Sequence, residues 1–172
     1  RAMQHLADQF KSRRVRKLYL SLVYGTPHAD RGSVDLPIGR HPQERKKISV
    51  VTHRPTTALT HWRIRERFAG ACLLELDIRT GRTHQIRVHC LSMGHPVIGD
   101  PVYGLRSSKK QLLRERPDLA RGLQTVDRQM LHAWRLVCRH PATGKQHLFQ
   151  SPLPADMSDL LEALRQLQPT QV

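Results

Sequence analysis

Residues 80–89, TGRTHQIRVH, hold four side chains that can carry positive charge or donate a hydrogen bond to an anion: Arg82, His84, Arg87 and His89. A strand is expected to stop at the glycine turn, and a helix to begin just after it. The free N–H groups of a helix N-terminus attract anions, and Arg82 adds a cation there. The stretch therefore favours a phosphate, such as that of a nucleic-acid backbone, although strand–glycine–helix junctions are common.

Arg87 is the most informative of these residues. On a helix it shares one face with His84, Val88 and Leu91, so it lies along a partly apolar stripe. A buried guanidinium needs a carboxylate or a phosphate to offset its desolvation. One use for it is to hold an aspartate ionised, because an adjacent Arg lowers a carboxyl pKa by roughly 1–3 units. The alternative is an Arg whose stem only covers apolar surface, and the spacing leaves both open.

Tyr19 is a second candidate. The segment 15–25, VRKLYLSLVYG, alternates in the manner of a strand, with its leucines on the core face and Lys17, Tyr19 and Ser21 on a polar face. An aromatic ring among basic residues is what a stacked nucleobase needs. A half-buried tyrosine with its hydroxyl in water is the alternative interpretation.

Metal and cofactor motifs are not evident. His84, His89, Cys90 and His95 lie close together in sequence, but they follow no HExxH or other regular ligand spacing. We therefore expect no metal, and the usual nucleotide and hydrolase motifs GxxxxGK, GxSxG and GxGxxG are also missing from the sequence. The three cysteines have long spacings and apolar neighbours, which predicts buried reduced thiols and a cytoplasmic protein.

The elements that must position these residues follow from periodicity and turn residues. The first helix shows its apolar face from residue 1 without an N-cap, which favours a piece of a longer protein. A second helix is expected over 83–93, with Thr83 as N-cap, and an acidic amphipathic helix over 156–167. The charged stretch 105–129 is expected to be a mobile excursion. Strands are expected at 15–25, 33–38, 47–52, 56–65, 71–79, 131–141 and 147–154.

The charge indicates the class of partner. Lys and Arg number 29 against 14 Asp and Glu, giving a formal net charge of +15 and a pI near 11. Such a balance on a folded domain favours a polyanion. We expect no membrane partner, since no apolar run approaches the roughly 20 residues that span a bilayer. RNA is favoured over DNA, because no helix-turn-helix or zinc-finger pattern occurs.

At this point a family resemblance can be stated. The string RTGRTHQIRVHCLSMGHPVIGDPVYG, residues 79–104, closely resembles the signature of the RluA/RluD-type pseudouridine synthases. KLYLSLVYG resembles that family's tyrosine-bearing strand, and MLHAWRLVCRHPATG and PLPADM resemble its C-terminal strand and tail. IGRHPQERKKISV and ALTHWRIRERF resemble the ribosomal large-subunit branch, nearest the RluD type. The likeness covers nearly the whole chain.

The resemblance implies a fold, a reaction and a set of site residues. The fold is α+β, with a mixed, mainly antiparallel sheet and flanking helices. The reaction is the isomerisation of uridine in large-subunit ribosomal RNA to pseudouridine, without cofactor or metal, on a nucleotide flipped out of its helix. Tyr19 and Arg87 match the family's catalytic tyrosine and the arginine that pairs with a nucleophilic aspartate. The RNA-binding residues are expected to be Lys17, Arg40, Arg82, His84 and Gln85, the last three at the pocket edge.

One departure from the family concerns the nucleophile. The family's aspartate lies in a motif like HRLDxxTSG, before the helix that opens this chain, and no such motif occurs here. Asp8 is on a helix, Asp77 faces outward from its strand, and Asp100 matches an aspartate that is not the nucleophile. We therefore expect residues 1–172 to be the C-terminal part of one catalytic domain, without an S4-like RNA-binding domain, and monomeric. The alternative is a non-catalytic RNA-binding protein derived from a synthase.

Overall fold

The computed structural model describes residues 1–44, 46–115, 117–119, 123 and 126–166. Its centre is a six-stranded sheet in the order β2-β5-β6-β1-β7-β8, in which every described pairing is antiparallel. The six strands are β1 (Arg16–Tyr24), β2 (Arg31–Asp35), β5 (Leu59–Phe68), β6 (Ala71–Ile78), β7 (Leu131–Arg139) and β8 (Gln146–Gln150). The expected α+β class and antiparallel character are confirmed, whereas the expected parallel component is not found among the described strands.

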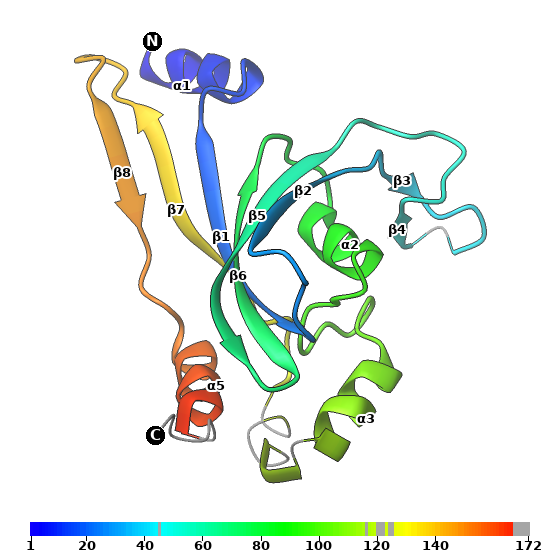
Figure 1. Ribbon diagram of the computed structural model, residues 1–172. Coiled ribbons are helices and arrows are strands. Elements are labelled where there is room, and N and C mark those ends of the chain that lie inside the picture. The colour runs from blue at the N-terminus through cyan, green and yellow to red at the C-terminus, as the bar shows by residue number, and fades with distance from the viewer. Residues whose placement is uncertain (45, 116, 120–122, 124–125, 167–172) are drawn as a thin grey trace.

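A second, two-stranded sheet pairs β3 (Gly39–Arg40) with β4 (Ile48–Ser49). We call residues 39–49 the basic hairpin, because Arg40, Lys46 and Lys47 lie in it. It stands to one side of the main sheet, close to α2 (Gln85–Ser92) (Figure 1). A small cluster of apolar side chains joins the two: Ile38, Ala58, Val88 and Tyr103 are buried, and Ile48 and Leu91 pack against them.

Helices cover the main sheet on opposite faces. Leu76 and Ile78 of β6 pack with Ile86 and Cys90 of α2 on the face that carries Tyr19. The opposite face packs Leu20 and Leu22 against two further helices, α3 (Arg106–Glu115) and α5 (Ala155–Gln166). Figure 1 shows these two helices at the end of the sheet remote from α1 (Ala2–Lys11). A short 3-10 turn, Pro117–Leu119, follows α3.

Several expectations for single elements need correction. The Tyr19 face of β1 is not a solvated polar face: Ser21 is fully buried and donates to the Met130 carbonyl, since both faces of the strand are covered there. The stretch expected to be a mobile excursion holds α3, which buries Leu112; Arg116 and Arg121 lie outside the described residues. The predicted apolar stripe of α1 does not face the core, because Met3 and Phe10 are exposed.

The buried thiols are as predicted. Cys72, Cys90 and Cys138 are free and buried. Burial raises the pKa of Cys72 and of Cys90 to about 12, so neither thiol is ionised at neutral pH. Among the described residues, no helix is both long enough and apolar enough to cross a bilayer.

Candidate functional site

The site is built around a buried ion pair between Arg87 of α2 and Asp100 of the loop after it. Arg87 Nε donates to Asp100 Oδ2 and Nη2 donates to Oδ1, both at 2.6 Å. The Asp100 side chain is fully buried, and that of Arg87 is 11% exposed. Arg87 therefore does not merely cover apolar surface, and its partner in this chain is an aspartate 13 residues further on.

Asp100 uses both of its oxygens in this arrangement. Besides Arg87 Nη2, its Oδ1 accepts the backbone N–H groups of Val102 and Tyr103, both at 2.9 Å. Burial by itself raises the pKa of Asp100, but the hydrogen bonds from Arg87, Tyr103 and Val102 outweigh it and hold the pKa below its usual range. An ionised carboxylate with its acceptors filled cannot approach a substrate carbon, so Asp100 fixes the loop and orients Arg87.

Arg87 keeps one further donor group. Its Nη1 takes part in no hydrogen bond with the residues that the structure describes, while the guanidinium lies 4.8 Å from the centre of the Tyr103 ring. The hydrogen bond from Arg87 to Asp100 raises the pKa of Arg87 further, so the group stays cationic. A second carboxylate can therefore be held at the free edge of the same guanidinium.

The turn before α2 is organised by Gln85. Its Oε1 accepts from the Thr80 hydroxyl at 2.7 Å and from the Arg82 N–H at 3.1 Å. Its Nε2 donates to the Leu59 carbonyl and to the Thr60 hydroxyl, at 3.0 and 2.9 Å. Gln85 is 2% exposed. The predicted position of Gln85 at the pocket edge is therefore wrong, because its amide is buried and makes two hydrogen bonds within the turn and two to β5.

His84 is also placed differently from the prediction. The helix begins one residue after it, and His84 takes a left-handed conformation with φ of 55°, while Thr83 does not cap the helix. The ring is partly buried and its Nδ1 lies 2.9 Å from the Tyr103 hydroxyl. Burial, followed by the charge of Arg87, lowers the pKa of His84, although Asp100 opposes this. His84 is therefore neutral at pH 7 and engaged inside the protein.

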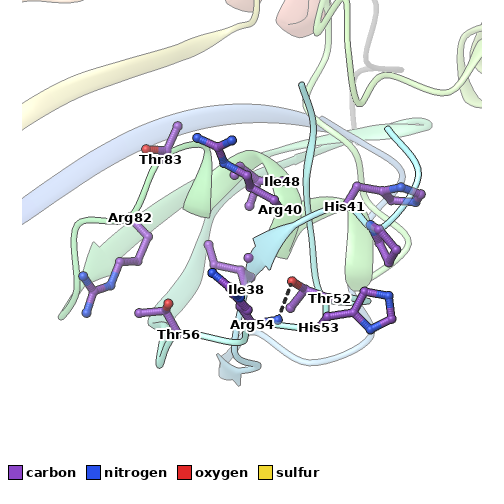
Figure 2. A pocket seen from close by; sticks show the side chains of 12 residues that line it. Ile38, Arg40, His41, Ile48, Thr52, His53, Arg54, Thr56, Arg82 and Thr83 are labelled. Carbon is purple, nitrogen blue, oxygen red and sulfur yellow. Dashed lines mark hydrogen bonds between the residues drawn. The ribbon is translucent and has the colours of Figure 1, made fainter. Parts of the chain in front are cut away.

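Arg82 and Arg40, both predicted to bind RNA, do come together. They line one open cavity of about 640 Å³ between the basic hairpin and the start of α2. Figure 2 shows Arg40 and Arg54 around this cavity, Arg82 and Thr83 on its α2 side, and His41 and His53 at the other end. Three arginines and two histidines around one opening suit an anionic ligand.

The histidine and arginine at 53 and 54 were missed by the sequence analysis. The sequence feature that could have indicated them is the basic pair His53-Arg54, which precedes a proline in a stretch without clear periodicity. The pairing that brings this segment back to the hairpin is a single bridge between Ile38 and Thr56, which periodicity does not reveal.

Tyr19 lies in a second cavity, of about 350 Å³, bounded by β1, β7 and β8. Lys17, Trp134, Arg135 and Phe149 also line it. The register between β1 and β7 shifts between Leu18 and Tyr19, and such a bulge re-aims the neighbouring side chains. Sequence reasoning found Lys17 and Tyr19 but missed the aromatic residues, which come from two later strands.

On the face of the sheet that carries Tyr19, this cavity offers the Tyr19 ring, the Lys17 ammonium and the Phe149 ring. Burial raises the pKa of Tyr19, so its hydroxyl is neutral at pH 7. The Arg135 guanidinium lies 3.7 Å from the centre of the Trp134 ring, and by register and packing this pair belongs to the opposite face of the sheet, with Leu20 and Leu22. Burial lowers the pKa of Lys17, partly offset by Asp77. A planar, partly polar ligand such as a nucleobase fits these surroundings.

The two cavities lie on the same side of the main sheet, since Tyr19 packs in the apolar cluster that contains Ile86 of α2. The four residues considered as metal ligands do not converge: His84, His89 and His95 each bond a different partner and Cys90 is buried. Among the described residues, no group of three or more His, Cys, Asp or Glu side chains is placed to hold a metal ion.

Comparison with known proteins places the chain among enzymes of one kind. Residues 1–92 match the family model described as RNA pseudouridylate synthase. The chain is 48% identical over 162 residues to the ribosomal large subunit pseudouridine synthase D of Nitrosomonas europaea, an overlap that covers 94% of this chain and 44% of that protein. It is 41% identical over 161 residues to the protein of the same name from Pseudomonas aeruginosa, covering 94% and 49%.

Solved structures agree with this result. Human RNA pseudouridylate synthase domain containing 1 superposes with a TM-score of 0.70 at 29% identity, covering 94% of this chain and 70% of that one. The chain spans about half the length of the curated relatives it matches. The likeness to these proteins therefore extends over nearly all of the 172 residues.

Proposed function

The chain belongs to the RNA pseudouridylate synthase family, and we propose that it provides most of a site that converts uridine in RNA to pseudouridine. In this isomerisation the bond from the ribose C1′ to the uracil N1 breaks and a bond from C1′ to the uracil C5 forms. The proton on C5 is lost and N1 gains one. The target nucleotide must leave its helix to be reached.

The observation that carries the proposal is the position of Tyr19. Its ring is half-buried in a cavity on the sheet, and Lys17 and Phe149 lie on the same face. A flipped uracil stacked on the Tyr19 ring would bring its sugar and phosphates near the Lys17 ammonium. The neutral phenol can then donate or accept one hydrogen bond at the edge of the base.

Arg87 is proposed to hold the nucleophile. Asp100 occupies its Nε and Nη2 and thereby fixes the guanidinium, leaving Nη1 for a second carboxylate. Asp100 accepts four hydrogen bonds already, and Asp77 pairs with Arg16 at 2.7 Å on the opposite face of the sheet, so neither takes that place. We propose that the nucleophilic aspartate belongs to a segment outside residues 1–172, which form the C-terminal part of the catalytic domain.

The cavity between the basic hairpin and α2 is proposed to bind the RNA backbone. Arg40, Arg54 and Arg82 line it and supply the cations that phosphates require. The proposed substrate is large-subunit ribosomal RNA, because two relatives at 48% and 41% identity carry that substrate in their names. We further propose a cytoplasmic monomer, a setting in which the three free thiols remain reduced.

The test is the pseudouridine content of large-subunit ribosomal RNA, measured by nucleoside analysis after incubation with residues 1–172 joined to the segment that carries the aspartate motif. Tyr19→Phe keeps the ring and removes the hydroxyl, so the RNA should still bind while pseudouridine formation slows by about 10²-fold or more. Tyr24→Phe is the matched control, since it removes the hydroxyl of a buried tyrosine outside the site. Wild-type protein that binds this RNA and forms no pseudouridine would overturn the proposal.

A further inference from the structure

Tyr103 connects the two halves of the site. It is 5% exposed and belongs to the small apolar cluster that joins the basic hairpin to α2. Its backbone N–H donates to Asp100 Oδ1 at 2.9 Å, and its ring lies under the Arg87 guanidinium at 4.8 Å. One end of this residue is therefore part of the Arg87–Asp100 pair.

The other end of Tyr103 contacts the hairpin. Its hydroxyl accepts the backbone N–H of Ile48 at 2.8 Å. Ile48 is paired with Arg40 across the two strands of the hairpin, and Arg40 lines the cavity with Arg82. The outer edge of β4 is thus held by a side chain rather than by a third strand, and Arg40 lies one strand away from that bond.

His84 determines how the Tyr103 hydroxyl is used. A tyrosine hydroxyl has one proton to donate and two lone pairs to accept with. The Ile48 N–H occupies a lone pair, so the hydroxyl proton is free for His84 Nδ1 at 2.9 Å. The neutral His84 ring accepts it and meets the Tyr103 ring edge-on, with centroids 5.5 Å apart. In this direction, which corresponds to the His84 tautomer protonated at Nε2, the Tyr103 hydroxyl uses its proton as well as a lone pair.

From these contacts we propose that Tyr103 is a positioning residue, whose hydroxyl docks the basic hairpin onto the Arg87–Asp100 pair and so places the RNA-binding cavity relative to the catalytic arginine. It does not touch substrate. The inference rests on the proposed function for the identity of the ligand, but the docking itself is a property of the fold. A loosened hairpin would cost RNA affinity, and would leave the chemical step unchanged once RNA is bound.

Tyr103→Phe is the test variant, because it keeps the ring against Arg87 and the N–H to Asp100 and removes the hydroxyl alone. Tyr24→Phe is the matched control: Tyr24 is 6% exposed, compared with 5% for Tyr103, and its hydroxyl takes a backbone hydrogen bond from Gly99, outside the hairpin. The first measurement is amide hydrogen exchange at Ile48. It should speed up about tenfold in Tyr103→Phe and stay at the wild-type rate in Tyr24→Phe.

The second measurement is steady-state kinetics and RNA affinity. In Tyr103→Phe the KM for RNA and the Kd should rise about three- to tenfold, with kcat within twofold of wild type; Tyr24→Phe should change neither. An unchanged Ile48 amide would overturn the proposal, as would unchanged affinity despite a faster amide or a fall in kcat alone. If residues 1–172 joined to the segment with the aspartate motif show no turnover, the proposed function fails, while amide exchange and RNA affinity still decide this inference.

Discussion

For the proposed role, Arg87 must stay positively charged and must keep a fixed position. Its Nε and Nη2 donate to Asp100, and its guanidinium lies over the Tyr103 ring. A buried pair of this kind stabilises little relative to an apolar pair, but removing one partner leaves an uncompensated charge. The pair is therefore best understood as a means of fixing a guanidinium.

The Arg87–Asp100 pair should show strong coupling in unfolding experiments. Arg87→Met leaves the buried Asp100 carboxylate unpaired and should lower the free energy of unfolding by about 3–5 kcal/mol. Adding Asp100→Asn should restore part of this loss, since the remaining group is neutral. Chemical denaturation of the wild type, the two single variants and the double variant gives the coupling energy. Additive effects of the two changes would contradict the pairing.

A second residue-scale prediction concerns pH and His89. Its side chain is fully buried between the Thr60 hydroxyl and the Leu36 carbonyl, and burial lowers its pKa from the ordinary value of 6.5. Above pH 6.5 both states hold a neutral ring. Below it, the unfolded chain takes up the proton first, so stability falls as the pH drops through 6.5 toward the lower folded pKa.

The measurement is the free energy of unfolding between pH 7 and pH 5. His89→Gln should flatten the acid loss, by up to about 1.4 kcal/mol per pH unit for one proton. His28→Gln is the control at an exposed histidine and should keep the wild-type curve. A His89→Gln curve parallel to that of the wild type would show that His89 does not contribute to the acid loss.

At the scale of elements, most strands and the terminal helix follow from the sequence because their apolar residues repeat with the period of the backbone. In β6, apolar and charged residues alternate in the sequence, but both faces are buried. One face packs against α2, and the other belongs to the apolar cluster that contains Leu20 and Leu22. α3 was missed since its charged residues outweigh Leu112 and Leu113, whose burial depends on the neighbouring core. Of the hairpin, the strand at residues 48–49 was expected and the one at residues 39–40 was not, because two-residue strands show no hydrophobic periodicity.

The site divides in the same way. Arg40 and Arg82 line one cavity, and Tyr19 lies near Lys17, since their positions follow from two short strands, a turn and a long strand. Gln85 was misplaced because a polar side chain in a turn is usually exposed, and here four hydrogen bonds to β5 and the turn bury it. The joining of Tyr103 to Ile48 spans 55 residues, and no local pattern predicts such a contact.

The basic hairpin gives an element-scale prediction about salt. If Arg40 contacts one phosphate, Arg40→Ala should reduce the slope of log affinity against log salt by about one. Arg31→Ala removes a charge on the opposite face of the sheet, by the register of β2 with β5, and should leave that slope nearly unchanged. Fluorescence anisotropy with a labelled ribosomal RNA fragment measures both. Equal effects of the two changes would show that RNA does not use the hairpin.

At the scale of the whole molecule, the residues proposed to bind the RNA backbone are separate from those proposed to act in the reaction. The net charge of +15 attracts RNA without setting its orientation. The hairpin cavity and the Tyr19 cavity, in contrast, open on one side of the sheet. The opposite side is occupied by α3, α5 and the surface ion pairs of Arg16 and Arg63. RNA is therefore expected to lie across the one side of the main sheet on which both cavities open. Arg87 would then lie between the elements that line the two cavities.

The most direct measurement is tritium release from large-subunit ribosomal RNA labelled at uridine C5. The protein is residues 1–172 joined to the segment that carries the aspartate motif, compared with its Arg87→Met variant at a temperature where both are folded. We predict release by the first, and at least a 10³-fold slower release by Arg87→Met with RNA affinity within a few-fold. Folded, RNA-bound protein that releases no tritium, or an Arg87→Met variant as fast as wild type, would contradict the account.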